Sequence, residues 1–384
     1  MRFIRKRAAY VGLAEKGKAM NKYDEMTAIP VFTERVWRTY LGGRLIDRLH
    51  GKPTKEQEDG HFPEEWITSL VAARNSGRAH VPEEGLSLLE DGRTLKSLIM
   101  SAPERYLGEE HVNKYGADTG VLIKLLDSSE RLTIQVHPNR EKAGQLFHSA
   151  YGKTEAWYIL GGRSIDGRPP CVYLGFKEGI TKAEWIRLFE RQDFEAMLDR
   201  LHCFPVKPGD IILIEGGIPH AIGAGCFLAE IQEPTDYTIR VERKTPAGFC
   251  VEDTMCHQGL GFEKMFECFD YTGRSEEETK KRWFLNKNQT EEQPGGTKSS
   301  IIRYEDTEFF KMDLLMVEDQ FRLSLEPVFS SIYVVSGGGW MEMNGVRMNL
   351  SAGKQFFLPA RTRQIDFYCS DTKPLQMLHC FGPK

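Results

Sequence analysis

Four polar residues in separate segments of the chain have the types and spacing of a metal site. Gln135 and His137 lie two residues apart, Glu155 follows further along, and His220 comes directly after a Gly-Gly-Ile-Pro corner. Two imidazoles, one carboxylate and one amide oxygen form a borderline-hard set of donors, which suits zinc with one position left for water or substrate. Because the set contains no thiolate, zinc held here would be catalytic rather than structural.

The metal-binding interpretation depends on strand alternation around the first two residues. Every second side chain of a β-strand points to the same face. Thr133, Gln135 and His137 of the strand predicted over 131–137 would therefore share one face. Polar side chains that face inward must be hydrogen-bonded or bound to a ligand. Taken alone, however, this segment fits an exposed polar strand face equally well.

The next two segments are also ambiguous when each is taken alone. Lys153 and Glu155 alternate onto one face, a pattern that is usually a solvated strand edge. A single histidine such as His220 is more often a buried core residue than a ligand.

A fourth segment, Glu-Ile-Gln-Glu-Pro-Thr-Asp-Tyr-Thr-Ile-Arg at 230–240, places Asp236, Thr238 and Arg240 on one strand face. The combination of the four segments favours a site over four unrelated polar faces.

Composition excludes several classes of protein. The 384 residues include 51 lysines and arginines and 55 aspartates and glutamates, giving a net charge of −4, and 40% are hydrophobic. Such a chain is globular, with roughly two to three domains, and has no basic face or tail for nucleic acid. It has no segment long enough to span a membrane, and its basic N-terminal residues lack a signal-peptide cleavage site. The sequence predicts no particular oligomeric state.

Cysteine usage indicates the compartment. The eight cysteines include no C-x-x-C pair, and a chain of this size needs no disulfide to stabilise it. We expect them to be reduced and without a role in metal binding, which predicts a cytoplasmic protein.

Short β-patterns bounded by glycine and proline recur along the chain, which predicts a mainly β fold of barrel or jelly-roll type. The predicted strands cover 121–127, 131–137, 154–160, 171–176, 209–214, 226–231, 237–242, 331–335, 339–343 and 355–358.

Helical segments interrupt these strands. One begins at Thr181, where Thr-Lys-Ala-Glu forms a capping box, and it predicts a helical insertion at about 180–202. Another begins at Ser275 with Glu278 as its box partner. It leads into the polar segment 286–300, which is predicted to be an interdomain linker.

These patterns predict the domain organisation. We expect an N-terminal extension at 1–28, a catalytic domain at 29–270, a helix and linker at 271–300, and a β domain at 301–384. The segments 206–220 and 350–360 share the order turn, glycine, strand, proline, so the two β regions are interpreted as distant repeats. His220 follows the proline in the first and Ala360 in the second, which predicts a C-terminal domain without a metal site.

The ordered motifs also resemble those of a known family. Gln-Val-His-Pro at 135–138, Gly-Lys-Thr-Glu-x-Trp-Tyr at 152–158, Pro-His-Ala-Ile-x-x-Gly at 219–225 and the segment 230–240 resemble class I (type I) mannose-6-phosphate isomerases of the cupin superfamily, in their compact bacterial form. Trp37 with Gly42-Gly43 is similar to the family's N-terminal signature. The segment Glu65-Trp66…Ser69 resembles a family segment in which a glutamate precedes a tryptophan and a serine. Either Glu64 or Glu65 would correspond to that glutamate.

The resemblance implies a fold of two cupin jelly-roll domains with one zinc ion per chain, held in the first domain. It implies that Gln135, His137, Glu155 and His220 are the zinc ligands. It also implies catalytic roles for Arg240 and Lys153. Thr133 corresponds to a hydroxyl near the substrate phosphate, and Lys124 and Asp236 are further candidates for binding the substrate.

The implied reaction interconverts mannose 6-phosphate and fructose 6-phosphate through a cis-enediol, whose charge zinc and Arg240 would stabilise. Lys153 is a candidate general base, with a zinc-bound hydroxide or Asp236 as alternatives. Two other functions stay open. One is isomerisation of another phosphosugar such as glucose 6-phosphate, and the other is sugar binding without catalysis.

The chain departs from the family pattern at several positions near the motifs, and one of them is Glu64, which stands where the family has glycine. Asn139 stands where the family usually has aspartate, but it lies outside the ligand set. Ile239 falls on the strand face opposite Arg240, so we expect it to alter packing first.

Overall fold

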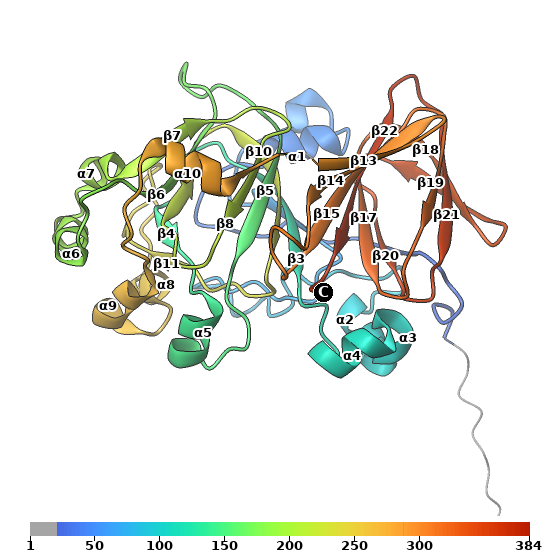
Figure 1. Cartoon of the computed structure of the whole chain (residues 1–384), viewed down its shortest axis with the longest axis horizontal. Helices are drawn as coiled ribbons and strands as arrows, with labels where there is room; N and C mark the ends of the chain where they lie inside the picture. Colours follow the sequence, from blue (N-terminus) through green and yellow to red (C-terminus); the bar gives the residue numbers. More distant parts are fainter. Residues whose placement is uncertain (1–20, 287) are drawn as a thin grey trace, which may run out of the picture.

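The computed structural model describes residues 21–286 and 288–384, which form two β units side by side (Figure 1). Each unit consists of two antiparallel sheets that enclose a hydrophobic core. The mainly β fold expected from the sequence is therefore confirmed. Residues 1–20 of the predicted N-terminal extension lie outside the described residues. Among the described residues, no helix has the length and apolar content needed to cross a membrane.

The N-terminal unit contains a six-stranded and a five-stranded sheet. In spatial order the larger sheet consists of β12 (Phe284–Leu285), β8 (Ile211–Ile214), β5 (Glu155–Gly162), β10 (Cys226–Gln232), β3 (Leu122–Asp127) and β2 (Glu64–Ile67). The smaller sheet consists of β11 (Ile239–Arg240), β4 (Gln135–Val136), β9 (His220–Ile222), β6 (Cys171–Phe176) and β7 (Leu201–Pro205).

The C-terminal unit contains a seven-stranded and a four-stranded sheet. The larger sheet has the order β1 (Ile29–Val31), β20 (Gln355–Leu358), β17 (Ser330–Ser336), β22 (Leu375–Phe381), β15 (Lys311–Val317), β14 (Gly296–Ile302) and β13 (Asn288–Gln293). The smaller sheet has the order β16 (Gln320–Ser324), β21 (Gln364–Cys369), β18 (Gly338–Met343) and β19 (Val346–Ser351).

The strand orders support the interpretation of a repeat. The order β12-β8-β5-β10-β3-β2 matches β1-β20-β17-β22-β15-β14, which leaves only β13 of the second large sheet without a counterpart. In the smaller sheets β4-β9-β6-β7 matches β16-β21-β18-β19, which leaves β11 unmatched. The strands β8 and β20 each follow a glycine with positive φ, Gly209 and Gly353, a backbone conformation that glycine adopts without strain. The strands that match β4 and β9 bury apolar side chains such as Phe321 and Phe367.

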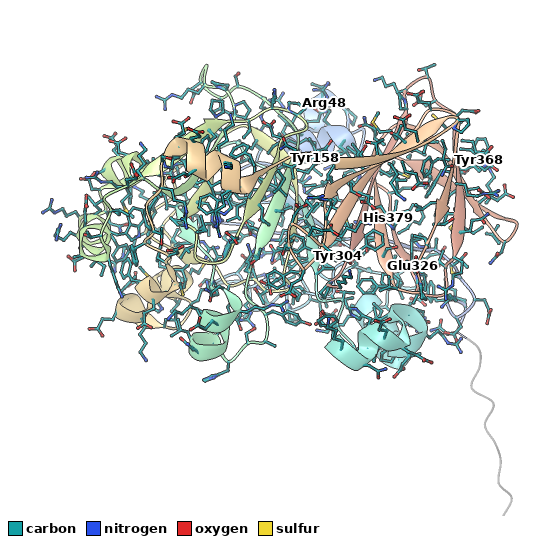
Figure 2. All side chains as sticks on the ribbon, in the orientation of Figure 1. Arg48, Tyr158, Tyr304, Glu326, Tyr368 and His379 are labelled. Carbon is teal, nitrogen blue, oxygen red and sulfur yellow. The ribbon has the colours of Figure 1, made fainter. Side chains whose placement is uncertain are left out.

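The two units pack through the outer faces of their large sheets. One continuous core cluster contains Leu125 and Tyr158 from the N-terminal unit together with Leu314, Tyr333 and Phe357 from the C-terminal unit. Figure 2 labels Tyr158 on its strand between the two units. Since apolar area is buried on both faces of each large sheet, the units stabilise one another.

Helices cover the edges of this double sheet arrangement (Figure 1). They are α1 (Arg44–Leu49), α2 (Leu95–Ser101), α3 (Pro103–Leu107), α4 (Glu109–Tyr115), α5 (Arg140–Phe147), α6 (Lys182–Arg191), α7 (Phe194–Asp199), α8 (Asp253–His257), α9 (Gly261–Lys264) and α10 (Glu276–Trp283), with 3₁₀ turns at Thr54–Glu56 and Met265–Cys268. The predicted helical insertion corresponds to α6 and α7, which are separated at Gln192. The box at Ser275 is complete, whereas Thr181 only accepts the backbone N–H of Glu184.

The predicted interdomain linker is wrong for most of its length. Residues 288–302 form the hairpin of β13 and β14, which turns at Gly295 and joins the seven-stranded sheet. Its polar sequence is explained by its place at the sheet edge, where one strand has only a single neighbour. The predicted domain limits shift as well, because β1 at 29–31 pairs with β20 of the C-terminal unit.

Helix α5 begins at an asparagine that caps it. The Asn139 side chain accepts the backbone N–H of Lys142 at 2.8 Å. Aspartate and asparagine are both strong N-caps, which explains why this departure from the family pattern leaves the helix intact.

Asn139→Ala should lower the free energy of unfolding by about 1 kcal/mol, because it leaves an N–H of the first turn without its partner. Denaturant unfolding measures this loss, with Asn139→Asp as the matched control that keeps the cap. If the alanine and aspartate variants unfold at the same denaturant concentration, the cap does not contribute.

His379 of β22 is a buried histidine of the C-terminal unit, labelled in Figure 2. Its Nε2 forms a 2.9 Å hydrogen bond with the Ser330 hydroxyl, and Asp313 is its neighbour across the ladder. Burial, with a smaller contribution from the charges of Lys311 and Lys298, lowers the pKa of His379 to about 3. The folded protein therefore holds this ring neutral.

His379→Gln should flatten the pH dependence of stability between about pH 6.5 and about pH 3. In this window the unfolded wild-type chain takes up a proton at this histidine and the folded chain does not, so the wild type loses stability as the pH falls. Chemical unfolding at a series of pH values measures the slope. An identical slope in both proteins would contradict the assignment.

Candidate metal centre and substrate pocket

The strand β4 shows the alternation expected from its sequence, although regular pairing covers only Gln135 and Val136. Ile134 and Val136 pack in the apolar cluster of α6 and α7, whereas Gln135 and His137 are buried on the other side, at 9% and 1% exposure. The alternative of an exposed polar strand face is therefore wrong.

Three residues converge on one point in the N-terminal unit. The possible metal-binding atoms of His137, Glu155 and His220 all lie within 4.8 Å of one another. Nε2 of His137 is 3.2 Å from one Glu155 carboxylate oxygen, and Nε2 of His220 is 3.5 Å from the other. His137 directly follows β4, Glu155 begins β5 and His220 begins β9, and all three are almost completely inaccessible to solvent.

Backbone hydrogen bonds orient both imidazoles. Nδ1 of His137 donates to the Tyr237 carbonyl at 2.8 Å, and Nδ1 of His220 donates to the Ile218 carbonyl at 2.9 Å. Each Nε2 therefore carries a lone pair directed into the cluster. Burial and the nearby Lys153 charge lower the pKa of His137 to about 3, which favours the neutral ring that binds metals.

Gln135 is the fourth member of the set. Its side-chain amide lies 3.2 Å from Nε2 of His220, and the two residues are direct partners in the β4–β9 ladder. The amide can present its oxygen or its nitrogen to this point by rotating about the last side-chain bond. Two imidazoles, a carboxylate and an amide oxygen that converge in a buried site, with oriented imidazoles, fit a zinc ion.

Lys153 is the only cation that touches the three converging residues among those described. Its Nζ lies 2.8 Å from Nε2 of His137 and forms an ion pair with Glu155. It is also 4.0 Å from the carboxylate of Glu230. The Trp157 indole donates to Glu155 at 3.0 Å, which fixes the carboxylate from the other side.

A polar pocket opens next to this cluster. Gln135 and Lys153 contact the converging histidines and also line this pocket. The remaining lining residues are Arg38, Thr39, Tyr40, Glu64, Lys124, Leu126, Leu132, Thr133, Glu230, Asp236, Thr238 and Arg240. All of the site residues predicted from the sequence therefore lie either in the converging set or in this pocket.

Asp236 and Arg240 differ in how they are paired. Asp236 accepts two hydrogen bonds from the Arg38 guanidinium, at 3.2 and 3.3 Å, and one from the Arg74 backbone N–H at 3.0 Å. Burial raises the pKa of Asp236, but the charges of Arg38, Lys124 and Arg240 and the hydrogen bond from the Arg74 backbone together outweigh this and bring it to about 2. Among the described residues, Arg240 donates to the carbonyl oxygens of Thr238 and Met255, at 3.1 and 3.0 Å, and to no carboxylate.

Lys124 is held by acidic residues. Its Nζ lies 3.1 Å from Glu230 and 4.0 Å from Glu64. Of the two glutamates that the sequence left open, Glu64 faces the pocket. Glu65 instead contacts His50, at the end of α1, and Gln355 of the C-terminal unit.

Sequence reasoning missed Arg38, Tyr40, Glu64 as a pocket residue, and a role for Glu230. Arg38 and Asp236 are 198 positions apart, so no local pattern could pair them. The one available signal was that Arg38 and Tyr40 lie between Trp37 and the Gly42-Gly43 pair of the N-terminal motif.

Comparisons with known proteins show which proteins this chain is similar to. Residues 53–155 match the family model "Phosphomannose isomerase type I, catalytic domain", and residues 300–368 match "Mannose-6-phosphate isomerase, cupin domain". The chain is 27% identical to the probable mannose-6-phosphate isomerase GmuF of Bacillus subtilis, over 86% of this chain and 92% of that protein. It is 32% identical to ManA of the same organism over 57% of this chain and 62% of that protein.

Solved structures share the fold. The mannose 6-phosphate isomerase from Bacillus subtilis superposes with a TM-score of 0.69 at 22% identity, covering 92% of this chain and 99% of that one. A zinc-bound mannose 6-phosphate isomerase superposes with a TM-score of 0.66 at 14% identity, covering 94% of this chain and 100% of that one. The expected pair of cupin-type β domains is thus confirmed. The two family models match in order along the chain, so the chain is similar to type I phosphomannose isomerases in both of its β units.

Proposed function

We propose that this chain is a zinc-dependent aldose–ketose isomerase that interconverts mannose 6-phosphate and fructose 6-phosphate through a cis-enediol intermediate. The observation that supports this best is the convergence of His137, Glu155 and His220 beside a pocket that also contains Arg240. A proton-transfer reaction on a phosphosugar needs both an electrophilic centre and a fixed positive charge.

In this proposal Gln135, His137, Glu155 and His220 hold one zinc ion per chain. When bound, zinc would supply Lewis-acid stabilisation of negative charge on a sugar oxygen.

Arg240 provides the fixed positive charge. Its guanidinium lines the pocket, and no carboxylate of the described residues lies within 4.0 Å of it. It can therefore pair with an anionic group of the substrate, either the developing enediolate or the phosphate. Thr133 contributes a hydroxyl to the same pocket. Lys124 is a weaker phosphate ligand, because Glu230 and Glu64 already neutralise it.

Lys153 is the residue best placed to hold or move the proton between the two sugar carbons. It belongs to the pocket and touches the metal-binding set at the same time. Asp236 is disfavoured in this role, because its carboxylate is occupied by Arg38 and the backbone of Arg74, and its pKa is about 2.

The proposal is tested by turnover of mannose 6-phosphate before and after chelation, with zinc added back afterwards. We expect chelation to abolish turnover and zinc to restore it. Glucose 6-phosphate assayed in parallel tests for isomerisation of another phosphosugar. Zinc content without turnover on any hexose phosphate would favour a sugar-binding protein and contradict the proposal.

His220→Ala should remove both bound zinc and turnover, because it deletes one of the converging nitrogens. The loss in zinc affinity should exceed the roughly 10–100-fold that removal of a ligand's hydrogen-bond partner costs. Metal analysis of the purified variant measures this, with His80→Ala, at an exposed histidine, as the matched control. A metal-free variant that remains fully active would disprove the site.

Arg240→Ala should keep its zinc and lose turnover by about 10²–10³-fold, which is typical for removal of one group that stabilises developing charge. Arg240→Lys keeps a positive charge and should lose less. Steady-state kinetics together with metal analysis separate the two effects. Activity near that of the wild type in Arg240→Ala would show that this residue has no catalytic role.

We also propose a cytoplasmic location. It is supported by the eight cysteines, all of which are free thiols, as is usual in a reducing compartment.

A further inference from the structure

Arg38 ties together two acidic residues on one wall of the pocket. Its Nε is 3.0 Å from the Glu64 carboxylate, and its two terminal nitrogens bind the two carboxylate oxygens of Asp236 at 3.2 and 3.3 Å. The guanidinium stacks 5.1 Å from the Trp66 ring, and the residue is only 5% exposed. A planar guanidinium suits such two-point binding of a carboxylate better than an ammonium does.

The backbone of Arg38 is also fixed. Its N–H donates to the His61 carbonyl at 2.8 Å, and its own carbonyl bonds to Nδ1 of His61 at 2.9 Å. The segment before β2 therefore presents this guanidinium in one place. A side chain that is held at both ends can act as a rigid support for the groups it binds.

The basic and acidic side chains in and around the pocket are not paired one to one. Lys124 pairs with Glu230, Lys153 pairs with Glu155, and Arg38 pairs with both Glu64 and Asp236. Arg240 has no carboxylate of the described residues within 4.0 Å. One cation that binds two acids therefore leaves another cation of the same pocket without an acidic partner.

Asp236 is the acid that would otherwise neutralise Arg240. It lies four positions before Arg240 in the chain, and both side chains line the same pocket. Burial lowers the pKa of Arg240, and the charge of Asp236 is the first of the effects that oppose this, so the two charges already act on each other. A buried carboxylate that lost Arg38 would have to find another cation.

We infer that Arg38 is a positioning residue that holds Asp236 away from Arg240, so that the Arg240 guanidinium stays free for the anionic group of the substrate. This inference rests on the proposed function, in that it assigns the free charge of the pocket to an anionic ligand. Glu64 does not depend on Arg38 in the same way, because Tyr40 and Trp66 each donate to it at 2.8 Å.

The test compares Arg38→Met, Asp236→Asn and the double variant, each loaded with zinc. Calorimetry with inorganic phosphate measures the free anion-binding charge without requiring turnover, and the KM for mannose 6-phosphate is measured beside it. Arg38→Met should weaken phosphate binding and raise KM by about tenfold or more, as expected for losing a hydrogen bond to a charged group.

The double variant separates positioning from support of the fold. With Asp236→Asn present, no carboxylate remains to neutralise Arg240, so the double variant should bind phosphate within about threefold of Asp236→Asn alone. A purely structural role for Arg38 would leave the double variant as weak as Arg38→Met, which would overturn the inference. Unchanged phosphate binding in Arg38→Met, or none in the wild type, would overturn it as well.

Two further controls keep the test decisive. If Arg38→Met does not fold, as judged by its thermal unfolding, Arg38→Lys with and without Asp236→Asn gives the same comparison, since lysine keeps the charge but loses the two-point contact. If the wild type binds phosphate but turns over no hexose phosphate, the proposed isomerase function fails while the positioning role of Arg38 is still decided by phosphate binding.

Discussion

The burial of the Glu155 carboxylate is the constraint on which the site depends. A carboxylate removed from water costs several kcal/mol unless it is paired and hydrogen-bonded. Here Lys153, the Trp157 indole and the Nε2 atoms of two neutral histidines surround it. The imidazoles add lone pairs rather than positive charge, so the arrangement favours a cation at their centre. A site of this kind stabilises the holoprotein and supplies the chemistry at once.

The rest of the pocket follows the same rule of paired charge. Lys124 with Glu230, and Arg38 with Glu64 and Asp236, are ion pairs inside the pocket wall. Such pairs contribute little net stability, since desolvation offsets much of their attraction. Their value lies in geometry, because each pair fixes which charges are neutralised and which one is left to meet the substrate. The free guanidinium of Arg240 is the result of that arrangement.

The two β units show how one topology can be used in two ways. Their sheets have matching strand orders apart from the additional edge strands β11 and β13. Among the described residues, the possible metal-binding group lies in the N-terminal unit. In the C-terminal unit the strands that match β4 and β9 bury side chains such as Phe321 and Phe367. That unit packs the outer face of its large sheet against the first, and its Gln355 donates a hydrogen bond to Glu65 of the strand β2. It therefore supports the catalytic unit rather than repeating it.

The sequence by itself identified the polar residues that converge in the structure, and most of the strands around them. Alternation around Gln135 and His137, the glycine corner before His220 and the ordered family motifs are local patterns, so they could be recognised along the chain. The strand at 171–176 and the cap at Ser275 were predictable for the same reason. The linker prediction failed, because a polar hairpin at a sheet edge has the composition of a linker.

Only the tertiary structure decided which charges meet. Arg38 and Asp236 are 198 positions apart, and β1 crosses to the sheet of the other unit. Pairings of this kind depend on how the chain closes over long distances, and no periodicity records them. The same holds for the choice between Glu64 and Glu65, since alternation puts neighbours on opposite faces but cannot say which face lines the pocket. The residues that converge could therefore be picked out along the chain, whereas the free charge of Arg240 appears only when its neighbours are placed around it.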